Sequence, residues 1–323
     1  MTTDLHPFTV AAIQSSPEPT DQTKALDRLA DLVRDAASNG AKLVACGETF
    51  LPGYPAWIDS CPGALTWDNP ETKRVYAEYR RNSVSIFGDG PRPAHDRLKS
   101  IAADHGVVLV VGVSERVDAG PGQGSLYNSL LTYDADGRLA NHHRKLVPTF
   151  TERCVWGHGD QAGLRSVDTA VGKVSALVCW EHWMPLPRQA LHAQGETVHV
   201  AVWPTVHERH QIASRHYAFE GRTHVIAVGQ IQRAGTHLPE EWTRMEGVGD
   251  DDLLLSGGSC VIGPNGEYLS GAEPVFDTET IIYAEVDPGR ADEESMTLDV
   301  TGHYHRAELF EFDVLPSDRP THE

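Results

Sequence analysis

A buried strand that ends in a cysteine is the first feature of this sequence that could support covalent chemistry. The apolar run 174–178 leads into Cys179, and the polar-aromatic sequence Trp180-Glu181-His182 follows it. A side chain at the end of a strand faces a crevice, and a thiol becomes a nucleophile only where a base or a positive charge favours the thiolate. Cys179 is therefore a candidate nucleophile, although cysteines are also common as plain core residues.

A second apolar run ends in a cysteine and then a carboxylate. Residues 43–46 end in Cys46, and Glu48 follows two positions later. A carboxylate that is removed from water there has a raised pKa, which suits a general base, although most glutamates are merely solvated. Cys46 is a competing nucleophile, and the local sequence does not separate it from Cys179.

Residues 142–153 read His-His-Arg-Lys-Leu-Val-Pro-Thr-Phe-Thr-Glu-Arg, with four potentially cationic groups in succession. Glu152 lies seven positions after Lys145. A buried lysine beside carboxylates can stabilise negative charge that develops on a reacting atom. Without more context, a basic surface loop is the simpler interpretation of this segment.

Two other patterns are weaker. His207 and His210 lie three residues apart on an expected helix, but they do not form the H-E-x-x-H zinc motif and have no obvious third ligand. The glycines in 120–124 lack the strand-to-helix context of a nucleotide-binding loop. The sequence therefore predicts neither a metal site nor a nucleotide cofactor.

The elements that must position these residues alternate between strands and helices. Expected strands span residues 8–14, 43–46, 107–113, 127–133, 138–142, 165–169, 174–179, 198–202, 225–230, 259–262, 268–269 and 280–286. Expected helices span residues 26–37, 71–87, 94–105, 187–194 and 209–222. Hairpin turns at 134–137 and 264–266 add antiparallel pairing. We expect a single α/β domain, residues 1–323, with two mixed sheets covered by helices.

Three segments interrupt this pattern. Residues 54–70 are rich in proline, glycine and tryptophan, and residues 234–258 contain an acidic Gly-Asp-Asp-Asp run. Long loops of this kind in a compact domain are usually functional or interfacial. The tail from about residue 288 is mostly polar but carries aromatic side chains, so we expect it to contribute to assembly.

Composition excludes several classes of partner. The 323 residues carry a formal net charge of −19, and no dense run of Lys or Arg is present. Nucleic acid and anionic membranes are therefore unfavourable partners. The longest clean apolar run, 107–111, is too short to span a bilayer. The amino-terminal residues 1–14 do not resemble a secretory signal either, so we expect a cytoplasmic protein. The five widely spaced cysteines predict free thiols.

Taken together, the three motifs resemble those of the nitrilase superfamily in order and spacing. They are E-T-F-L-P-G-Y-P at 48–55, H-R-K-L-V-P-T at 143–149 with E-R at 152–153, and C-W-E-H at 179–182. The C-W-E form resembles the true nitrilase branch, and G-H-Y at 302–304 is similar to a tail motif of bacterial nitrilases. The resemblance extends from about Phe8 to Phe310.

The resemblance implies a four-layer αββα sandwich with mixed sheets. It implies Cys179 as nucleophile, Glu48 as general base, Lys145 as electrostatic stabiliser and Glu152 as the carboxylate that positions Lys145 and substrate. It also resolves the choice between the two cysteines in favour of Cys179. Dimers that pair helices across an interface are the implied building block, and many members of the branch extend into spirals.

The implied reaction converts an organic nitrile to the carboxylic acid and ammonia through a thioimidate and a thioester, without metal or organic cofactor. Candidate substrate-binding residues are Tyr54, Trp180 and His182; His182 stands where many nitrilases have asparagine. Further aromatic side chains for a pocket wall are Trp57, Trp183 and Trp203. Alternatives are a cyanide dihydratase or hydratase, an amidase with the same four residues, and a non-catalytic assembly protein on the same sandwich.

Overall fold

The computed structural model of the protein describes residues 6–87, 91–240 and 242–317. Within those residues the strands form two seven-stranded sheets. The first sheet has the order β14-β1-β2-β4-β5-β6, with β3 beside β4. Its strands are β1 (Phe8–Gln14), β2 (Ala41–Cys46), β3 (Val84–Ser85), β4 (Val108–Arg116), β5 (Leu126–Tyr133), β6 (Leu139–Arg144) and β14 (Thr280–Val286). Parallel pairs β1–β2 and β2–β4 adjoin antiparallel pairs β4–β5 and β5–β6, so this sheet is mixed.

The second sheet has the order β11-β12-β10-β9-β8-β7, with β13 beside β12. Its strands are β7 (Val167–Thr169), β8 (Gly172–Val178), β9 (Val198–Val202), β10 (His224–Val228), β11 (Ile231–Arg233), β12 (Leu253–Ile262) and β13 (Val275–Phe276). Strands β8, β9 and β10 are parallel, whereas β7 and β12 pair antiparallel with their neighbours. The second sheet is therefore mixed as well.

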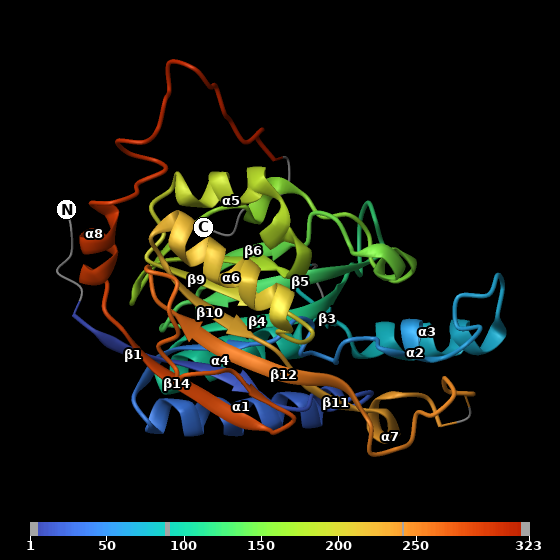
Figure 1. Ribbon diagram of the computed structural model, residues 1–323. Helices are drawn as coiled ribbons and strands as arrows, with labels where there is room; N and C mark the ends of the chain where they lie inside the picture. The colour runs from blue at the N-terminus through green and yellow to red at the C-terminus, as the bar shows by residue number, and fades with distance from the viewer. Residues whose placement is uncertain (1–5, 88–90, 241, 318–323) are drawn as a thin grey trace.

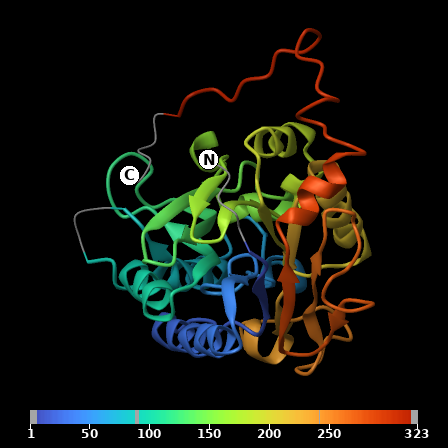
Figure 2. The same cartoon turned by 90° about the vertical axis from the view of Figure 1, so that its left-hand side faces the viewer.

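Helices cover the outer faces of both sheets (Figure 1). The first sheet lies against α1 (Gln22–Ser38) and α4 (Pro93–His105), and the second lies against α5 (Pro185–His192) and α6 (Glu208–Gly221). Figure 2 shows the four layers from the side. The remaining helices are α2 (Trp57–Ser60), α3 (Pro70–Asn82), α7 (Ala234–His237), α8 (Gly289–Ser295) and the short 3-10 helices η1 (Phe150–Cys154), η2 (Gln161–Gly163) and η3 (Cys179–Trp183).

Side chains alternate between two apolar layers along each central strand, as strand geometry requires. In β1, Val10 and Ala12 belong to the layer between the two sheets, whereas Ala11 and Ile13 belong to the layer under α1 and α4. Strands β2 and β4 repeat this alternation. Because each sheet is apolar on both faces, it needs a helical layer outside and the other sheet inside. The expected αββα sandwich is confirmed.

Most expected elements differ from the structure by a few residues at their ends, and three differences are larger. The helix expected over 71–87 ends at Asn82, and residues 84–85 pair with β4 as strand β3 instead. Residues 234–258 are not one loop, because α7 opens the segment and its last residues, from Leu253 on, begin β12. The expected strand at 268–269 is reduced to a single bridge between Tyr268 and Ile262.

The tail leaves the sandwich after α8 and arches over the α5 side of the molecule (Figures 1 and 2). Arg222 holds its beginning by donating hydrogen bonds to the Leu298 carbonyl and the Thr297 hydroxyl. Gln161 donates to the carbonyl of Pro316 near the end of the described tail. The aromatic and aliphatic side chains between these contacts are largely exposed: Tyr304, Leu309, Phe310, Val314 and Leu315.

Candidate active site

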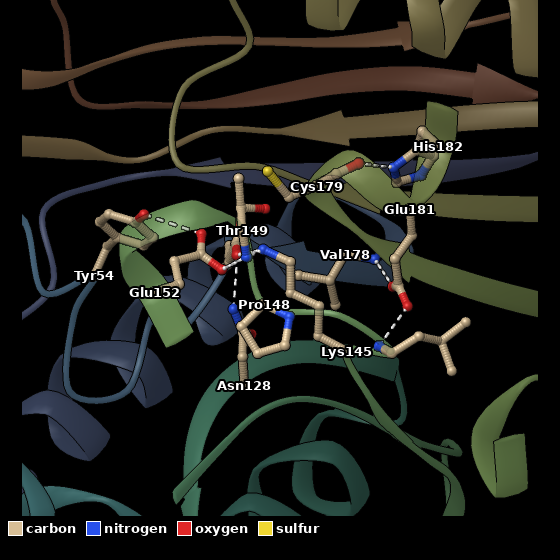
Figure 3. Close-up of polar contacts among 12 residues, drawn as sticks. Tyr54, Asn128, Lys145, Pro148, Thr149, Glu152, Val178, Cys179, Glu181 and His182 are labelled. Atoms are coloured by element: carbon tan, nitrogen blue, oxygen red, sulfur yellow. Dashed lines mark hydrogen bonds and ion pairs between the residues drawn. The ribbon is translucent and has the colours of Figure 1, made fainter. Parts of the chain in front are cut away.

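Cys179 lies where strand β8 of the second sheet passes into η3. Its backbone is left-handed, with φ of 53°, a conformation that costs a non-glycine residue energy. The side chain is buried, and its sulfur points to the side of Lys145 and Glu152, whereas its carbonyl points to His182 (Figure 3). The strained turn therefore aims the thiol toward the lysine and the carboxylates that the first sheet and η1 supply.

Lys145 lies directly after strand β6 of the first sheet and is held between two carboxylates. Its Nζ donates to Oε1 of Glu48 at 2.8 Å and to Oε2 of Glu152 at 2.7 Å. Glu152 lies in η1, where its Oε2 also accepts from the Thr149 backbone N–H and its Oε1 accepts from the Tyr54 hydroxyl at 3.0 Å. The lysine and both carboxylates are buried, so the ammonium has a fixed position.

Glu48 lies in the turn after β2, and its two carboxylate oxygens have different surroundings. Oε1 accepts from Lys145 and from the side-chain amide of Asn128 at 2.7 Å. Among the described residues, Oε2 has no hydrogen-bond partner. The turn rests directly on β4, because a Cβ at Gly112 would lie 2.3 Å from the carbonyl oxygen of Gly47. One oxygen of the base is thus anchored and the other is available for a proton.

The charges of the site set its protonation. Burial raises the pKa of Glu48 to about 7, against the lowering effect of Lys145. Burial would lower the pKa of Lys145, but the neighbouring thiol and the two carboxylates outweigh it and raise that pKa. Burial and the Glu48 carboxylate raise the pKa of the Cys179 thiol well above its usual value. The resting site therefore holds a neutral thiol, a lysine cation and a base that titrates near neutral pH.

Glu181, the third residue of the C-W-E motif, connects the two halves of the site. Its carboxylate accepts from the backbone N–H of Val178 at 2.7 Å and from that of Leu146 at 2.8 Å. The His143 ring lies 2.9 Å from the same carboxylate. Glu181 thus joins the end of β8, beside the nucleophile, to the end of β6, beside the lysine.

The three candidate substrate-binding residues lie in different surroundings. Tyr54 touches Glu152 and borders a pocket of about 260 Å³ that Trp57 also lines. The Trp180 side chain is 56% exposed and packs edge-on against Trp183. His182 is buried, and its ring contacts the Cys179 carbonyl and the interior of the second sheet.

Trp203 does not add to an exposed aromatic wall. Its side chain is fully buried, and its ring stacks on His210 at a centroid distance of 4.4 Å. Trp57 is also buried and packs edge-on against Trp242. Of the larger aromatic set, only Trp183, which is 39% exposed, shares an open surface with Trp180.

The interpretation of residues 142–153 as a basic surface loop is wrong. His142, His143 and Lys145 are buried, and each faces a carboxylate. The partner of His142 is Glu115, that of His143 is Glu181, and those of Lys145 are Glu48 and Glu152. Cys46, the competing nucleophile, lies in the apolar layer under α1 and α4, on the face of the first sheet turned away from the second sheet.

The sequence patterns missed Asn128, Glu181 and Gln230. Gln230, which follows β10, donates a side-chain hydrogen bond to the backbone carbonyl of Glu48. The place of Glu181 in the C-W-E motif could have indicated its role, whereas no local pattern marks Asn128 or Gln230. Across the described residues, no group of three or more His, Cys, Asp or Glu side chains could hold a metal ion.

Comparison with known proteins identifies the family of the chain. The chain matches the carbon-nitrogen hydrolase family over residues 9–293. It is 37% identical to Nitrilase 2 from an unknown prokaryotic organism, with 97% of this chain and 94% of that protein covered. It is 34% identical to an aliphatic nitrilase of Sinorhizobium fredii (strain HH103), with 95% of each covered.

Solved structures show the same fold. The carbon-nitrogen hydrolase of Helicobacter pylori G27 superposes with a TM-score of 0.71 at 19% identity, covering 95% of this chain and 98% of that one. The family match over residues 9–293 and the relatives at 34% and 37% identity show that the protein belongs to the carbon-nitrogen hydrolase family. Its relatives' names confirm the resemblance to the nitrilase branch.

Proposed function

We propose that the protein hydrolyses an organic nitrile to the carboxylic acid and ammonia, with Cys179 as nucleophile. The observation that carries this proposal is the lysine cation held between two buried carboxylates beside a strand-end thiol. Burying three ionised groups is costly, and an inert sandwich gains nothing from it that apolar side chains would not supply. This argument disfavours a non-catalytic assembly protein.

The first step forms a covalent intermediate. Glu48 takes the thiol proton on its free Oε2, and the sulfur of Cys179 attacks the nitrile carbon. Negative charge develops on the nitrile nitrogen, where the Lys145 ammonium and the Trp180 backbone N–H stabilise it, each contributing on the order of 3 kcal/mol in a dry site. Protonation of that nitrogen gives a thioimidate.

Two waters complete the reaction. The first, activated by Glu48, adds to the thioimidate carbon, and the resulting tetrahedral intermediate expels ammonia to leave a thioester. The second hydrolyses the thioester, which releases the acid and returns the proton to the thiol. Lys145, flanked by Glu48 and Glu152, keeps the leaving nitrogen protonated, so acid should dominate over amide.

The test is ammonia release from aliphatic, arylacetic and aromatic nitriles, with chromatography of the products and each matching amide offered separately. Wild-type protein should release acid, and the Cys179→Ala variant should release nothing while retaining its fold. Faster turnover of the amide, or amide as the main product from nitrile, would indicate an amidase or hydratase. Preference for free cyanide would indicate a cyanide dihydratase, and no turnover of any nitrile would refute the proposal.

A pocket with both polar and apolar lining lies beside Tyr54, and none of Glu48, Lys145, Glu152 and Cys179 lines it. Its lining includes Pro52, Trp57, Tyr79 and Leu238, and its volume is about 260 Å³. Tyr54 separates this pocket from Glu152 and donates to that carboxylate. We propose that Tyr54 and Trp180 contact substrate. We propose that His182 does not contact substrate but holds the backbone of Cys179 through its carbonyl oxygen.

We further propose that the chain forms one domain that assembles into homo-oligomers. Exposed apolar side chains on η3, α5 and α6 support a face that pairs with a second copy: Trp180, Trp183, Leu186, Ile212 and Phe219. The exposed aromatic side chains after residue 288 support a role for the tail. Removing residues after Asp299 should reduce particle size on light scattering; an unchanged size would exclude the tail from the interface.

The cysteines bear on the location of the protein. All five lie in described residues, and all are free thiols. Free thiols persist in reducing compartments, which supports our proposal of a cytoplasmic location. Within the described residues, no helix combines the length and apolar character needed to cross a membrane.

A further inference from the structure

A chain of buried polar side chains lies behind the nucleophile, on the side away from Lys145. The His182 ring lies with Nδ1 2.7 Å from the Cys179 carbonyl oxygen and Nε2 3.0 Å from Nε2 of His199. Nδ1 of His199 lies 2.7 Å from the Ser175 hydroxyl oxygen and 3.1 Å from Oε2 of Glu196. All five residues are buried, so protein groups rather than bulk water must satisfy these contacts.

Counting hydrogens along this chain fixes the direction of its bonds. A carbonyl oxygen only accepts, so Nδ1 of His182 carries a hydrogen and donates it to Cys179. The neutral His182 ring then has a lone pair on Nε2, because burial keeps its pKa well below the usual value. The facing Nε2 of His199 must therefore carry the hydrogen. Burial lowers the pKa of His199, so its ring is neutral and its Nδ1 accepts a hydrogen bond from the Ser175 hydroxyl, 2.7 Å away. His199 thus sets which nitrogen of His182 is protonated.

Glu196 anchors the far end of the chain. Its carboxylate meets side chains from three elements, namely Ser175 of β8, His192 of α5 and Tyr217 of α6. The Tyr217 ring also stacks on His199 at a centroid distance of 3.8 Å. These contacts hold His199 in one orientation from both its edge and its face.

The bond from His182 acts on the strained residue itself. Cys179 has a left-handed backbone, and the hydrogen bond to its carbonyl stabilises that conformation. The same turn directs the sulfur toward Lys145 and Glu152 (Figure 3). Losing the bond would let the turn relax and move the sulfur away from its base without removing any group that touches substrate.

We propose that His199 is a positioning residue for the nucleophile: by donating from Nε2 to His182, it holds the Cys179 turn in its reactive conformation. The inference rests on the proposed function only in taking Cys179 as nucleophile. Glu196 and Tyr217 keep His199 in place, so the whole chain acts through one hydrogen bond to a backbone carbonyl.

Two amide substitutions at position 199 separate positioning from packing. In His199→Gln, the amide nitrogen can occupy the place of Nε2 and donate to His182. In His199→Asn, the shorter amide reaches only the place of Nδ1 and cannot. The control is His224→Asn, which removes an equally buried imidazole from the neighbouring strand β10 outside this chain of contacts.

Two measurements apply to each variant. The first is the split of kcat and KM for the best nitrile. The second is the rate at which iodoacetamide alkylates Cys179, read by peptide mass spectrometry against the exposed Cys154 as an internal reference. The alkylation readout needs no substrate, so it tests the positioning role even if nitrile turnover fails.

We expect His199→Asn to lower kcat and Cys179 alkylation by about tenfold to a hundredfold, the range for loss of one hydrogen bond at a reactive group, with KM nearly unchanged. His199→Gln should recover both to within about fivefold, and His224→Asn should leave both near wild type. Equal losses in the two position-199 variants, or full reactivity in His199→Asn, would overturn the proposal. If His199→Asn does not fold, a His199→Gln variant that folds with slow alkylation would overturn it equally.

Discussion

Removing the side-chain amide of Asn128 should make the proposed base harder to ionise. Asn128 donates to Oε1 of Glu48 at 2.7 Å, and this hydrogen bond favours the carboxylate over the protonated acid. Asn128→Leu keeps a similar side-chain volume but has no donor. The pKa of Glu48, already raised to about 7 by burial, should therefore rise further.

The size of the shift follows from the energy of the lost bond. A hydrogen bond to a charged group contributes about 1.5 to 3 kcal/mol, and one pKa unit corresponds to about 1.4 kcal/mol. The pKa of Glu48 should therefore rise by about one to two units. Because the ionised form is the active one, kcat/KM at pH 7 should fall by roughly fivefold to fiftyfold and recover in alkaline buffer.

The assay is ammonia release from a nitrile between pH 5 and 10, because the acid limb of kcat/KM reports the pKa of the free enzyme's base. The matched control is Asn141→Leu in strand β6. Asn141 is also buried and also donates its amide, but to the carbonyl of Gly163, outside the active site. Its acid limb should stay near that of wild type.

Two outcomes would refute the reasoning. A lower plateau with an unmoved acid limb would mean that Asn128 supports the shape of the site but does not tune Glu48. An acid limb displaced toward lower pH would reverse the sign of the argument, because it would mean that the amide favours the protonated acid.

Other predictions concern the lysine, the tyrosine and the buried carboxylate of the second sheet. Lys145→Met and Glu152→Gln should each lower kcat by at least about a hundredfold, and the double variant should lose much less than the product of the two factors, as groups acting on one transition state do. Tyr54→Phe should lower kcat by about tenfold, through loss of one hydrogen bond to Glu152, while circular dichroism stays unchanged. The pKa of Glu196 is lowered from 4.5 to about 2, because the hydrogen bond with His192 and the other side chains at its oxygens outweigh burial. Its contribution of up to about 3 kcal/mol is therefore present above pH 4.5 and lost as pH falls toward 2. In urea unfolding, Glu196→Gln should be less stable than wild type at pH 7, and the difference should shrink over that acid range.

The side chains proposed for catalysis each stand in a short local pattern, but only the resemblance to the nitrilase superfamily assigned their roles. Glu48 and Cys179 follow apolar strands, and Lys145 and Glu152 share one segment of twelve residues, 142–153. Whether that segment is buried depends on carboxylates that lie far away in sequence, such as Glu115 and Glu181, so its local composition favoured a surface loop instead.

Asn128 and His199 were not predictable in the same way. Asn128 meets Glu48 across 80 positions of the chain, and the pairing of β2 with β4 and of β4 with β5 brings them together. His199 meets His182 only once β8 and β9 lie parallel. Short polar side chains inside strands carry no periodic signal that separates such roles from ordinary burial.

Errors in the elements have similar causes. The two-residue strand β3 pairs with β4 but is too short for any alternation to show, so the helix over 71–87 was extended through it. Strand β12 begins inside the segment 234–258, and two adjacent glycines with positive φ, Gly257 and Gly258, interrupt its pattern there. Long central strands such as β1 were correctly predicted, because burial on both faces makes them almost entirely apolar.

The nucleophile and its base come from different sheets. Cys179 follows a strand of the second sheet, whereas Glu48 and Lys145 follow strands of the first. The rate of turnover therefore depends on the spacing between the two sheets. A small loosening of the apolar contact between the sheets moves the Cys179 thiol away from both Glu48 and Lys145. In mild urea, activity should vanish while the circular dichroism of the helices and strands is still intact. Substitutions in the apolar layer between the sheets, such as Val110→Ala, should then change the rate of turnover although they alter no polar group of the site.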